Sequence, residues 1–241
     1  MEDLKMLYVL IQVGNIKYNP IDKKELKSNI IANRLKEILL LFSKNNTESF
    51  WIDKAEMLIS ELIKFIRLYN NNYVTFDEIH KIINDNTYYI CKKKVIKKKL
   101  LKNEYTEEEV FNINTSVDYI EKEFLKLDER TKGIIVAEIS RITGLFVLNY
   151  DINKTFCPKE NEINFKGFKE VIEQGKIVVL KMNTSRYGDI SRIIASYLKM
   201  DFQREVLIQA IKEDKNKIRK TAFISDEYQE YVTKNDSNFY S

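Results

Sequence analysis

Glycine, proline, cysteine and histidine are all scarce in this sequence. The 241 residues include six glycines and two prolines, about 3% together, where average proteins have roughly 12%. This scarcity excludes collagen-like, linker-like and turn-dense all-β chains. The two cysteines form no CxxC pair and there is one histidine, which excludes zinc fingers, histidine-based triads and multi-histidine metal sites.

Apolar and charged residues are present in the proportions of a folded protein. Hydrophobic residues make up 44% of the chain and aromatic residues 12%, which is more than a disordered chain carries. Forty basic and 36 acidic side chains leave a net charge of +4, so no global charge demands a nucleic acid partner. No apolar run approaches the roughly 18 residues of a membrane span, and the acidic start MEDLK differs from a secretory signal. We expect a soluble, reduced, cytoplasmic chain that is rich in helix.

The first two thirds of the chain divide into a short β region and a long helical one. Residues 7–13 and 16–20 surround Gly14-Asn15 and predict a β-hairpin. From residue 24 to about residue 148, apolar residues recur at helical spacing with almost no strand signal. Thr75 stands three residues before Glu78, and Thr106 three before Glu109, and each spacing predicts a capping box at a helix start.

The pattern changes after the polar stretch 149–164. Residues 176–182 (KIVVLKM) are short and β-branched and predict a buried strand. A loop and a long helix follow over residues 183–213, and residues 221–225 (TAFIS) predict a second buried strand. Strand, helix and strand in parallel geometry form an α/β unit.

The sharpest chemical signal is the segment TAFISDEYQEY, residues 221–231. An apolar strand that ends in two adjacent carboxylates has the geometry of a Walker B motif, whose first acid helps to hold Mg²⁺ and whose second orients the attacking water. The carboxyl ends of parallel strands are also where α/β sheets bind ligands. Asp226 is therefore the candidate metal and cofactor ligand and Glu227 the candidate catalytic residue. A polar surface turn after a buried strand explains the same two acids without any chemistry.

No Walker A loop accompanies this candidate. The G-x-x-x-x-G-K-[ST] loop holds the phosphates of a nucleotide, and none of the six glycines lies in such a segment. Gly175-Lys176 is followed by Ile177 and has no glycine five residues earlier. We therefore expect that the chain is not a complete P-loop enzyme.

Five segments in order carry a family resemblance. They are YNPIDKKELKSNIIANRLKEIL (18–39), FWIDKAEMLISELIKFI (50–66), YVTFDEI (73–79), GKIVVLKMNTSRYGDISRIIASYLKMDFQREVL (175–207) and TAFISDEYQEYVTKNDSNF (221–239). From about residue 16 to the end, the chain resembles the type IV secretion coupling proteins, which are the TraG/TraD-like conjugative DNA-transfer ATPases, particularly their Gram-positive mobile-element branch.

The resemblance implies an α/β fold with a large all-α insertion. Residues 1–22 would be a β-hairpin remnant of a RecA-like nucleotide-binding domain, residues 23–148 an all-α domain, and residues 149–241 the second part of the RecA-like domain with the Walker B strand. By this resemblance Asp226 would bind the Mg²⁺ of Mg-ATP, and Glu227 would activate water.

Members of the family are ATP-hydrolysing motors that work as homo-hexamers on the cytoplasmic side of the bacterial plasma membrane. They feed single-stranded DNA and its relaxase into the type IV secretion channel. The membrane anchor, the Walker A loop and everything after the Walker B strand have no counterpart in this sequence. The chain therefore resembles an internal fragment that binds neither ATP nor Mg²⁺ tightly and does not hydrolyse ATP alone.

Residues 92–102 hold seven lysines around four apolar residues. Such a stripe can bind a phosphate backbone with salt-dependent affinity. We expect weak, sequence-independent DNA binding through Lys93, Lys94, Lys97 and Lys98. A solvated helix face explains the lysines equally well.

The sequence fits two functions, one of an enzyme and one of a binding protein. The first is a portion of a coupling ATPase. The second is a stand-alone helical adaptor or DNA-binding module without ATPase activity. Solution behaviour separates the two, because a fragment that lacks strands exposes sheet edges and apolar faces and aggregates, whereas a stand-alone module melts cooperatively.

Overall fold

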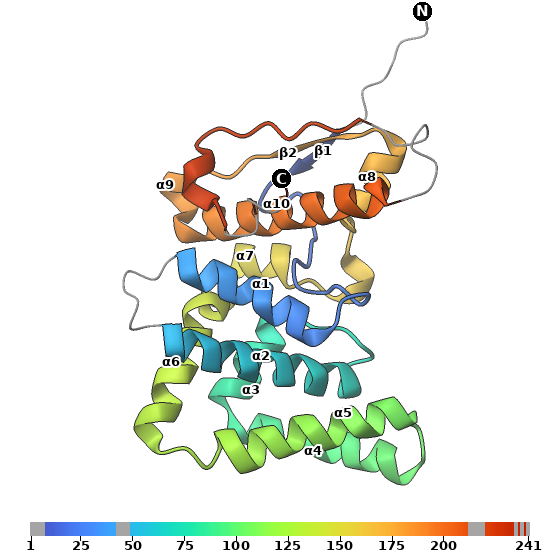
Figure 1. Ribbon diagram of the computed structural model, residues 1–241, viewed down its shortest axis with the longest axis vertical. Coiled ribbons are helices and arrows are strands. Elements are labelled where there is room, and N and C mark those ends of the chain that lie inside the picture. The colour runs from blue at the N-terminus through green and yellow to red at the C-terminus, as the bar shows by residue number, and fades with distance from the viewer. Residues whose placement is uncertain (1–7, 42–48, 212–219, 234–235, 237–238, 240–241) are drawn as a thin grey trace, which may run out of the picture. The chain divides into compact units, whose positions relative to one another are not determined.

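The chain is mostly helical and consists of two compact units (Figure 1). The computed structural model describes residues 8–41, 49–211, 220–233, 236 and 239. Unit 1 combines residues 1–20 with residues 154–241, and unit 2 is the continuous segment 21–153. None of the helices described is both long enough and apolar enough to cross a bilayer.

The helices of unit 2 run from α1 to α7. They are α1 (Ser28–Leu41), α2 (Ser49–Tyr69), α3 (Phe76–Asn84), α4 (Asn86–Leu101), α5 (Glu107–Asp118), the π-helix η2 (Tyr119–Phe124), α6 (Glu129–Val147) and α7 (Tyr150–Phe156), the last of which crosses the division between the units.

Unit 1 contains both strands and the longest helix. Its elements are β1 (Tyr8–Ile11), the 3₁₀ turn η3 (Glu160–Glu162), α8 (Phe168–Gln174), β2 (Ile177–Leu180), α9 (Thr184–Tyr187), α10 (Asp189–Ala210) and the 3₁₀ turn η5 (Tyr228–Tyr231).

Helix α2 is the centre of unit 2, since it contacts α1, α3, α4, α5, α6 and η2. The apolar residues that recur at helical spacing in its sequence are all at most 3% exposed: Ala55, Leu58, Ile59, Leu62, Ile63 and Ile66. Ile52 and Phe65 are also fully buried. A helix that buries residues on so much of its circumference needs partners on several sides, and the surrounding helices provide them.

The two predicted helix starts are present, but only one is a complete capping box. Thr106 accepts a hydrogen bond from the Glu109 backbone N–H, and the Glu109 carboxylate accepts one from the Thr106 N–H in return. Thr75 accepts from the Glu78 backbone N–H at 3.1 Å. The Glu78 carboxylate instead accepts hydrogen bonds from two tyrosine hydroxyls, so the reciprocal half of that box is wrong.

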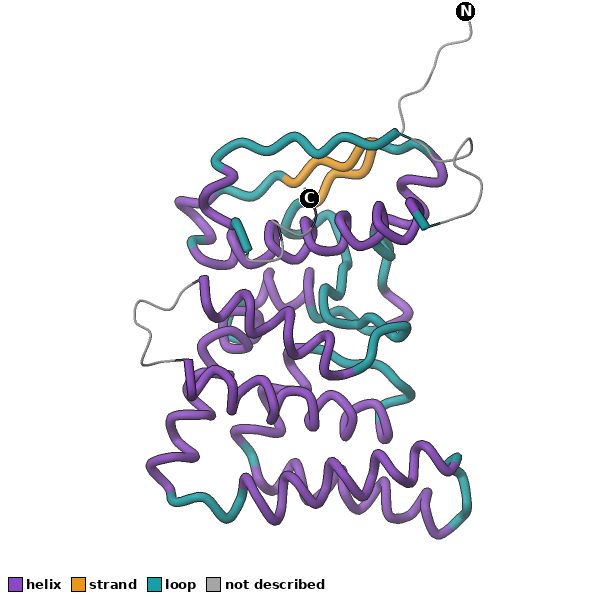
Figure 2. Tube along the Cα trace, viewed as in Figure 1, coloured by secondary structure: helices purple, strands orange, loops and turns teal. Residues whose placement is uncertain are grey.

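The predicted N-terminal β-hairpin is wrong. Strand β1 pairs with β2 in parallel, with Tyr8 opposite Ile177 and Ile11 opposite Leu180 (Figure 2). Residues 16–20 are not a strand, because their backbone groups find partners elsewhere in unit 1: the Tyr18 N–H donates to the Thr155 carbonyl at 2.9 Å. The chain does turn at Gly14, whose φ of 89° suits glycine.

The predicted strand 176–182 exists as β2, but the predicted strand 221–225 does not. Residues 221–225 form no ladder with the described strands, and Ile224 is 94% exposed. β2 is itself only half covered, with Ile177 and Val179 each 45% exposed. Both segments have the apolar composition of buried parallel strands, but the described part of the chain provides only two strands and leaves this apolar surface open.

Aromatic rings connect the separate segments of unit 1. Successive ring centroids lie 5.2 to 6.5 Å apart along a series formed by Tyr18, Phe165, Phe168, Phe202, Phe223, Tyr228 and Tyr231. Most of these pairs meet edge to face, which is the arrangement that aromatic quadrupoles favour. The series joins the N-terminal segment to α8, α10 and the C-terminal segment, so the core of unit 1 is assembled from residues far apart in sequence.

We predict that truncating the Phe146 side chain strongly destabilises unit 2. The Phe146 and Phe76 rings stack at 4.1 Å and both are fully buried. Phe146→Ala should lower the free energy of unfolding by about 3–5 kcal/mol, whereas Phe111→Ala, at a side chain 66% exposed, should change it by less than about 0.5 kcal/mol. Urea denaturation of the two variants checks this, and equal losses would contradict the buried stack.

We also predict a pH dependence that comes from His80. Its Nδ1 lies 2.9 Å from the Thr143 hydroxyl, and burial lowers the pKa of the imidazole against an opposing effect of Asp77. The unfolded state therefore takes up a proton at a higher pH than the folded state. Stability should fall as the pH decreases below about 6.5. The chain has no other histidine. The melting temperature of His80→Gln should therefore change less between pH 7 and pH 5.5 than the melting temperature of the wild type, as thermal denaturation at several pH values would show.

Candidate functional site

Asp226 and Glu227 lie in an exposed bend just before η5. One Asp226 carboxylate oxygen accepts a hydrogen bond from the Glu227 backbone N–H at 3.0 Å. The Asp226 carbonyl accepts from the Tyr231 hydroxyl at 3.0 Å. Glu227 has a φ of 50°, a left-handed conformation that few non-glycine residues adopt. The two acids are adjacent and accessible, but they follow an extended segment rather than a buried strand.

The described residues place no third metal ligand beside these acids. Among the residues that the structure describes, no group of three or more His, Cys, Asp or Glu side chains could hold a metal. Mg²⁺ is usually bound by one or two carboxylates together with water and substrate phosphates. Asp226 would fill that role with water or substrate phosphates as the remaining ligands, and its role as a Mg²⁺ ligand stays a prediction.

Two cations on α10 contact residues that follow the two acids. Arg192 forms an ion pair with Glu230 at 2.6 Å. Lys199 donates to the Tyr231 carbonyl at 2.6 Å. Sequence reasoning did not single out Lys199, although the sequence contains a signal: a lysine and an aspartate, two residues apart, interrupt the apolar pattern in the middle of a long helix.

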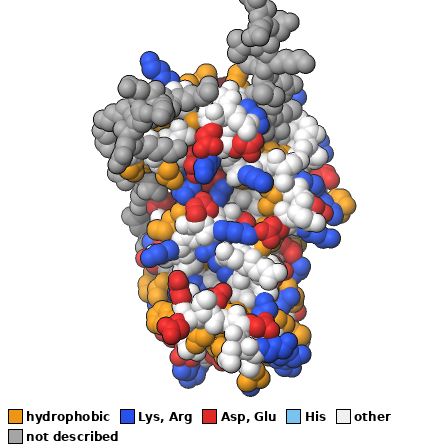
Figure 3. Space-filling view, turned by 90° about the vertical axis from the view of Figure 1, so that its right-hand side faces the viewer, with side chains coloured by type: hydrophobic (Ala, Val, Ile, Leu, Met, Phe, Trp, Pro, Cys, Tyr) orange, Lys and Arg blue, Asp and Glu red, His pale blue; other side chains and the backbone are white. Residues whose placement is uncertain are grey.

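Helix α4 presents three of the four candidate DNA-binding lysines to solvent. Lys94, Lys97 and Lys98 are exposed, and no ion pair to another described residue holds them. Lys93 instead forms an ion pair with Glu121 of η2 at 2.5 Å. This pair partly neutralises the charge of Lys93 and connects α4 to η2. Figure 3 shows a group of Lys and Arg side chains at the lower right of the visible face, with acidic and hydrophobic side chains beside it.

A partly buried hydrogen-bond cluster fixes the inner side of α4. The Glu78 carboxylate accepts from Tyr69 at 2.5 Å and from Tyr88 at 3.0 Å. Lys92 places its ammonium 5.0 Å and 4.8 Å from the centres of these two rings. Burial, followed by the Glu78 charge, raises the pKa of both tyrosines. Lys92 therefore faces the protein, and α4 separates into a packed side and a basic outer side.

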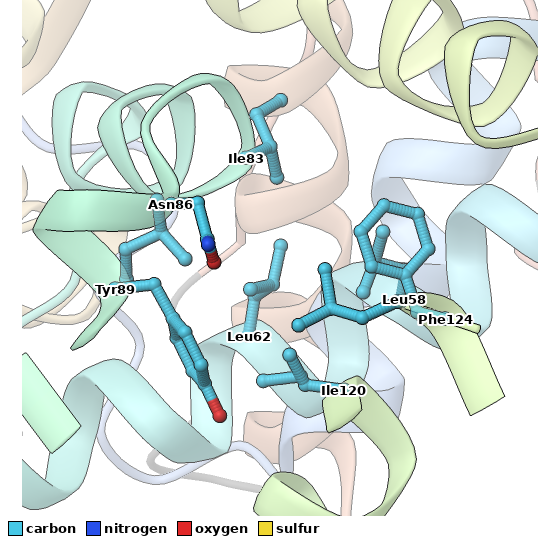
Figure 4. Close-up of a pocket in the computed structure, with 9 residues that line it drawn as sticks. Leu58, Leu62, Ile83, Asn86, Tyr89, Ile120 and Phe124 are labelled. Carbon is cyan, nitrogen blue, oxygen red and sulfur yellow. The ribbon is translucent and has the colours of Figure 1, made fainter. Parts of the chain in front are cut away.

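Two cavities lie in unit 2 beside the π-helix. The smaller, of about 50 Å³, is shown in Figure 4, where Leu58, Leu62, Ile120 and Phe124 lie around one space with Tyr89. Its lining is mainly apolar, with Asn86 as a polar exception, and its volume is too small for an organic ligand. The Tyr89 hydroxyl donates to Glu121 at 3.2 Å, outside the cavity.

The larger cavity, of about 270 Å³, is mainly apolar and aromatic. Its lining consists of Phe50, Trp51, Lys54, Leu58, Tyr119, Glu123, Phe124, Leu127, Thr131 and Ile135. Burial and then the charge of Glu123 raise the pKa of Tyr119 to about 12, so its phenol is neutral at physiological pH. One cation (Lys54), one carboxylate (Glu123) and the hydroxyls of Tyr119 and Thr131 contribute polar groups to this lining. The lining therefore does not favour a ligand of one particular charge.

Comparison with protein-family models, with curated proteins and with solved structures found no match to this chain.

Proposed function

We propose that this chain is a portion of a conjugative coupling ATPase that takes part in DNA transfer through a type IV secretion system. The observation that supports the proposal is the connectivity of the fold. An all-helical unit is inserted between the two segments of a second unit, and the parallel strands of that second unit, β1 and β2, come from either side of the insertion. A partial RecA-like domain interrupted by an all-α domain has this connectivity.

In this proposal unit 1 carries the chemical site and unit 2 recruits the relaxase and its single-stranded DNA. Asp226 would bind the Mg²⁺ of Mg-ATP, and Glu227 would orient the attacking water. The complete protein would act as a homo-hexamer on the cytoplasmic side of the plasma membrane, next to the secretion channel. Both acids are exposed in the chain as described, which supports the expectation that it does not hydrolyse ATP alone.

An ATPase assay tests this proposal. The chain with Mg-ATP should give no turnover above that of its Glu227→Gln variant. The DNA on either side of the reading frame should encode a G-x-x-x-x-G-K-[ST] segment. The joined protein should hydrolyse ATP, and Glu227→Gln should reduce its kcat by about 100-fold or more. Turnover by the chain alone that Glu227→Gln abolishes would contradict the proposal.

A second candidate is a stand-alone helical adaptor or DNA-binding module, and the basic outer side of α4 favours it. Lysine binds phosphate as a flexible point charge, and Lys94, Lys97 and Lys98 lie within about one turn of helix. Contacts of this kind neutralise phosphates without reading base edges. Binding through α4 would therefore be weak and independent of sequence.

Charge reversal on α4 tests this candidate. Changing Lys94, Lys97 and Lys98 to Glu should lower the affinity for a single-stranded oligonucleotide at least tenfold at low salt. The slope of log K against log salt should become shallower by about 2. Lys93 is left unchanged because it pairs with Glu121. The matched control changes three exposed lysines of unit 1, Lys166, Lys169 and Lys181, to Glu. Equal losses in both triple variants, or no loss in either, would reject α4 as the DNA contact.

A further inference from the structure

The side chain of Lys199 is buried in the middle of α10. It is 1% exposed, although lysine is almost never fully buried without a partner. Its ammonium donates to the Tyr231 carbonyl at 2.6 Å and to an Asp236 carboxylate oxygen at 2.6 Å. The Thr233 hydroxyl lies 3.5 Å away. The three acceptors around this ammonium, Tyr231, Thr233 and Asp236, lie close together in sequence near the C-terminal end.

Asp236 is held as completely as Lys199. The oxygen that accepts from Lys199 also accepts from the Thr233 backbone N–H at 2.8 Å. The other oxygen accepts from the Gln203 side-chain amide at 2.8 Å. Gln203 is one turn beyond Lys199 and lies on the same side of α10. The Asp236 side chain is only 7% exposed, so the ion pair is dry and fully hydrogen-bonded.

A dry ion pair depends on both of its partners. Burial lowers the pKa of Lys199, and the hydrogen bond with Asp236 opposes that effect. Burial acts to raise the pKa of Asp236, but the hydrogen bonds from Lys199, Gln203 and Thr233 lower it overall. Removing one partner leaves an uncompensated charge in the interior, which is far more costly than removing both.

The residues that this pair holds begin at Tyr231, at the end of η5 and four positions after Glu227. The ion pair between Glu230 and Arg192 of α10 is exposed to solvent and contributes little, whereas Tyr231, Thr233 and Asp236 are held by the buried Lys199. The Tyr231 hydroxyl in turn donates to the Asp226 carbonyl at 3.0 Å. The backbone around Asp226 and Glu227 is thus connected to α10 through Tyr231.

We propose that Lys199 is the positioning residue of the Asp226-Glu227 pair: together with Asp236 it clamps Tyr231 and Thr233 onto α10, and through Tyr231 it fixes the backbone that presents the two carboxylates. The clamp is supported by the set of hydrogen bonds and the ion pair described above. Its importance for metal binding rests on the proposed function.

Hydrogen exchange of the full chain, followed by mass spectrometry, tests the clamp. In Lys199→Met, the amides of residues 226–233 should exchange at least tenfold faster than in wild type, while the amides of α2 in unit 2 stay unchanged. Arg192→Met is the matched control, because it removes an ion pair from the same helix to the same segment, but at a side chain 45% exposed. Its exchange should change less than twofold. Equal rates in wild type and Lys199→Met would overturn the clamp.

A double variant keeps the test decisive if the single variant fails to fold. Lys199→Met with Asp236→Leu removes both buried charges, which proteins often tolerate. Residues 226–233 should exchange as fast in the double variant as in Asp236→Leu alone, because the two side chains act as one unit. Wild-type protection in the double variant would overturn the proposal, since apolar packing would then hold the segment.

Binding of Mn²⁺, followed by electron paramagnetic resonance, separates positioning from packing. Asp226→Asn should abolish the signal of the bound ion, Lys199→Met should weaken binding at least fivefold, and Arg192→Met should leave it unchanged. Equal Mn²⁺ binding by wild type and Lys199→Met would overturn the positioning role. An absence of Mn²⁺ binding in wild type would remove the metal role of Asp226 from the proposed function, and the exchange experiment would still decide the clamp.

Discussion

A pair of buried charges on one helix determines how unit 1 is put together. Lys199 and Asp201 are two residues apart, so they point to different sides of α10. Lys199 holds the C-terminal segment through Asp236, and Asp201 accepts a hydrogen bond from the buried Tyr18 hydroxyl at 2.6 Å. Each buried charge would be costly without its partner. The helix therefore specifies which segments pack on its two sides, and it joins the beginning of the unit to its end.

Unit 2 is held together in a different way. Its centre, α2, buries residues on most of its circumference, and polar contacts connect the helices around this apolar core. The Glu78 carboxylate shows how these contacts connect helices. It does not cap its own helix α3 but accepts hydrogen bonds from tyrosine hydroxyls on α2 and α4. Local contacts of this kind need no residues from outside 21–153. Because its contacts are internal, unit 2 can be inserted as one continuous segment between the two segments of unit 1.

The helices could be predicted from the sequence far better than the strands. Spacing and caps are local, and Thr106 with Glu109 or Gly175 after α8 act within a few residues of the helix end that they define. The partner of β1 is β2, which is more than 160 residues away along the chain, and no local pattern specifies that pairing. A hairpin was expected because its partner was nearby in sequence. Lys199 was overlooked because its partner, Asp236, is likewise distant.

The exposed apolar surface and the exposed acids of unit 1 have a common cause. Ile177, Val179 and Ile224 have the character of buried strand residues but face solvent, and a parallel sheet normally has both faces covered. The carboxylates of Asp226 and Glu227 follow the same open segment. Charges act strongly on a reacting group only in a site from which water is excluded. Additional strands and helices over this surface would therefore do two things at once: they would bury the apolar residues and give the acid pair an environment in which it can act. A stand-alone adaptor would need neither, which is why the state of this surface in solution separates the two candidate functions.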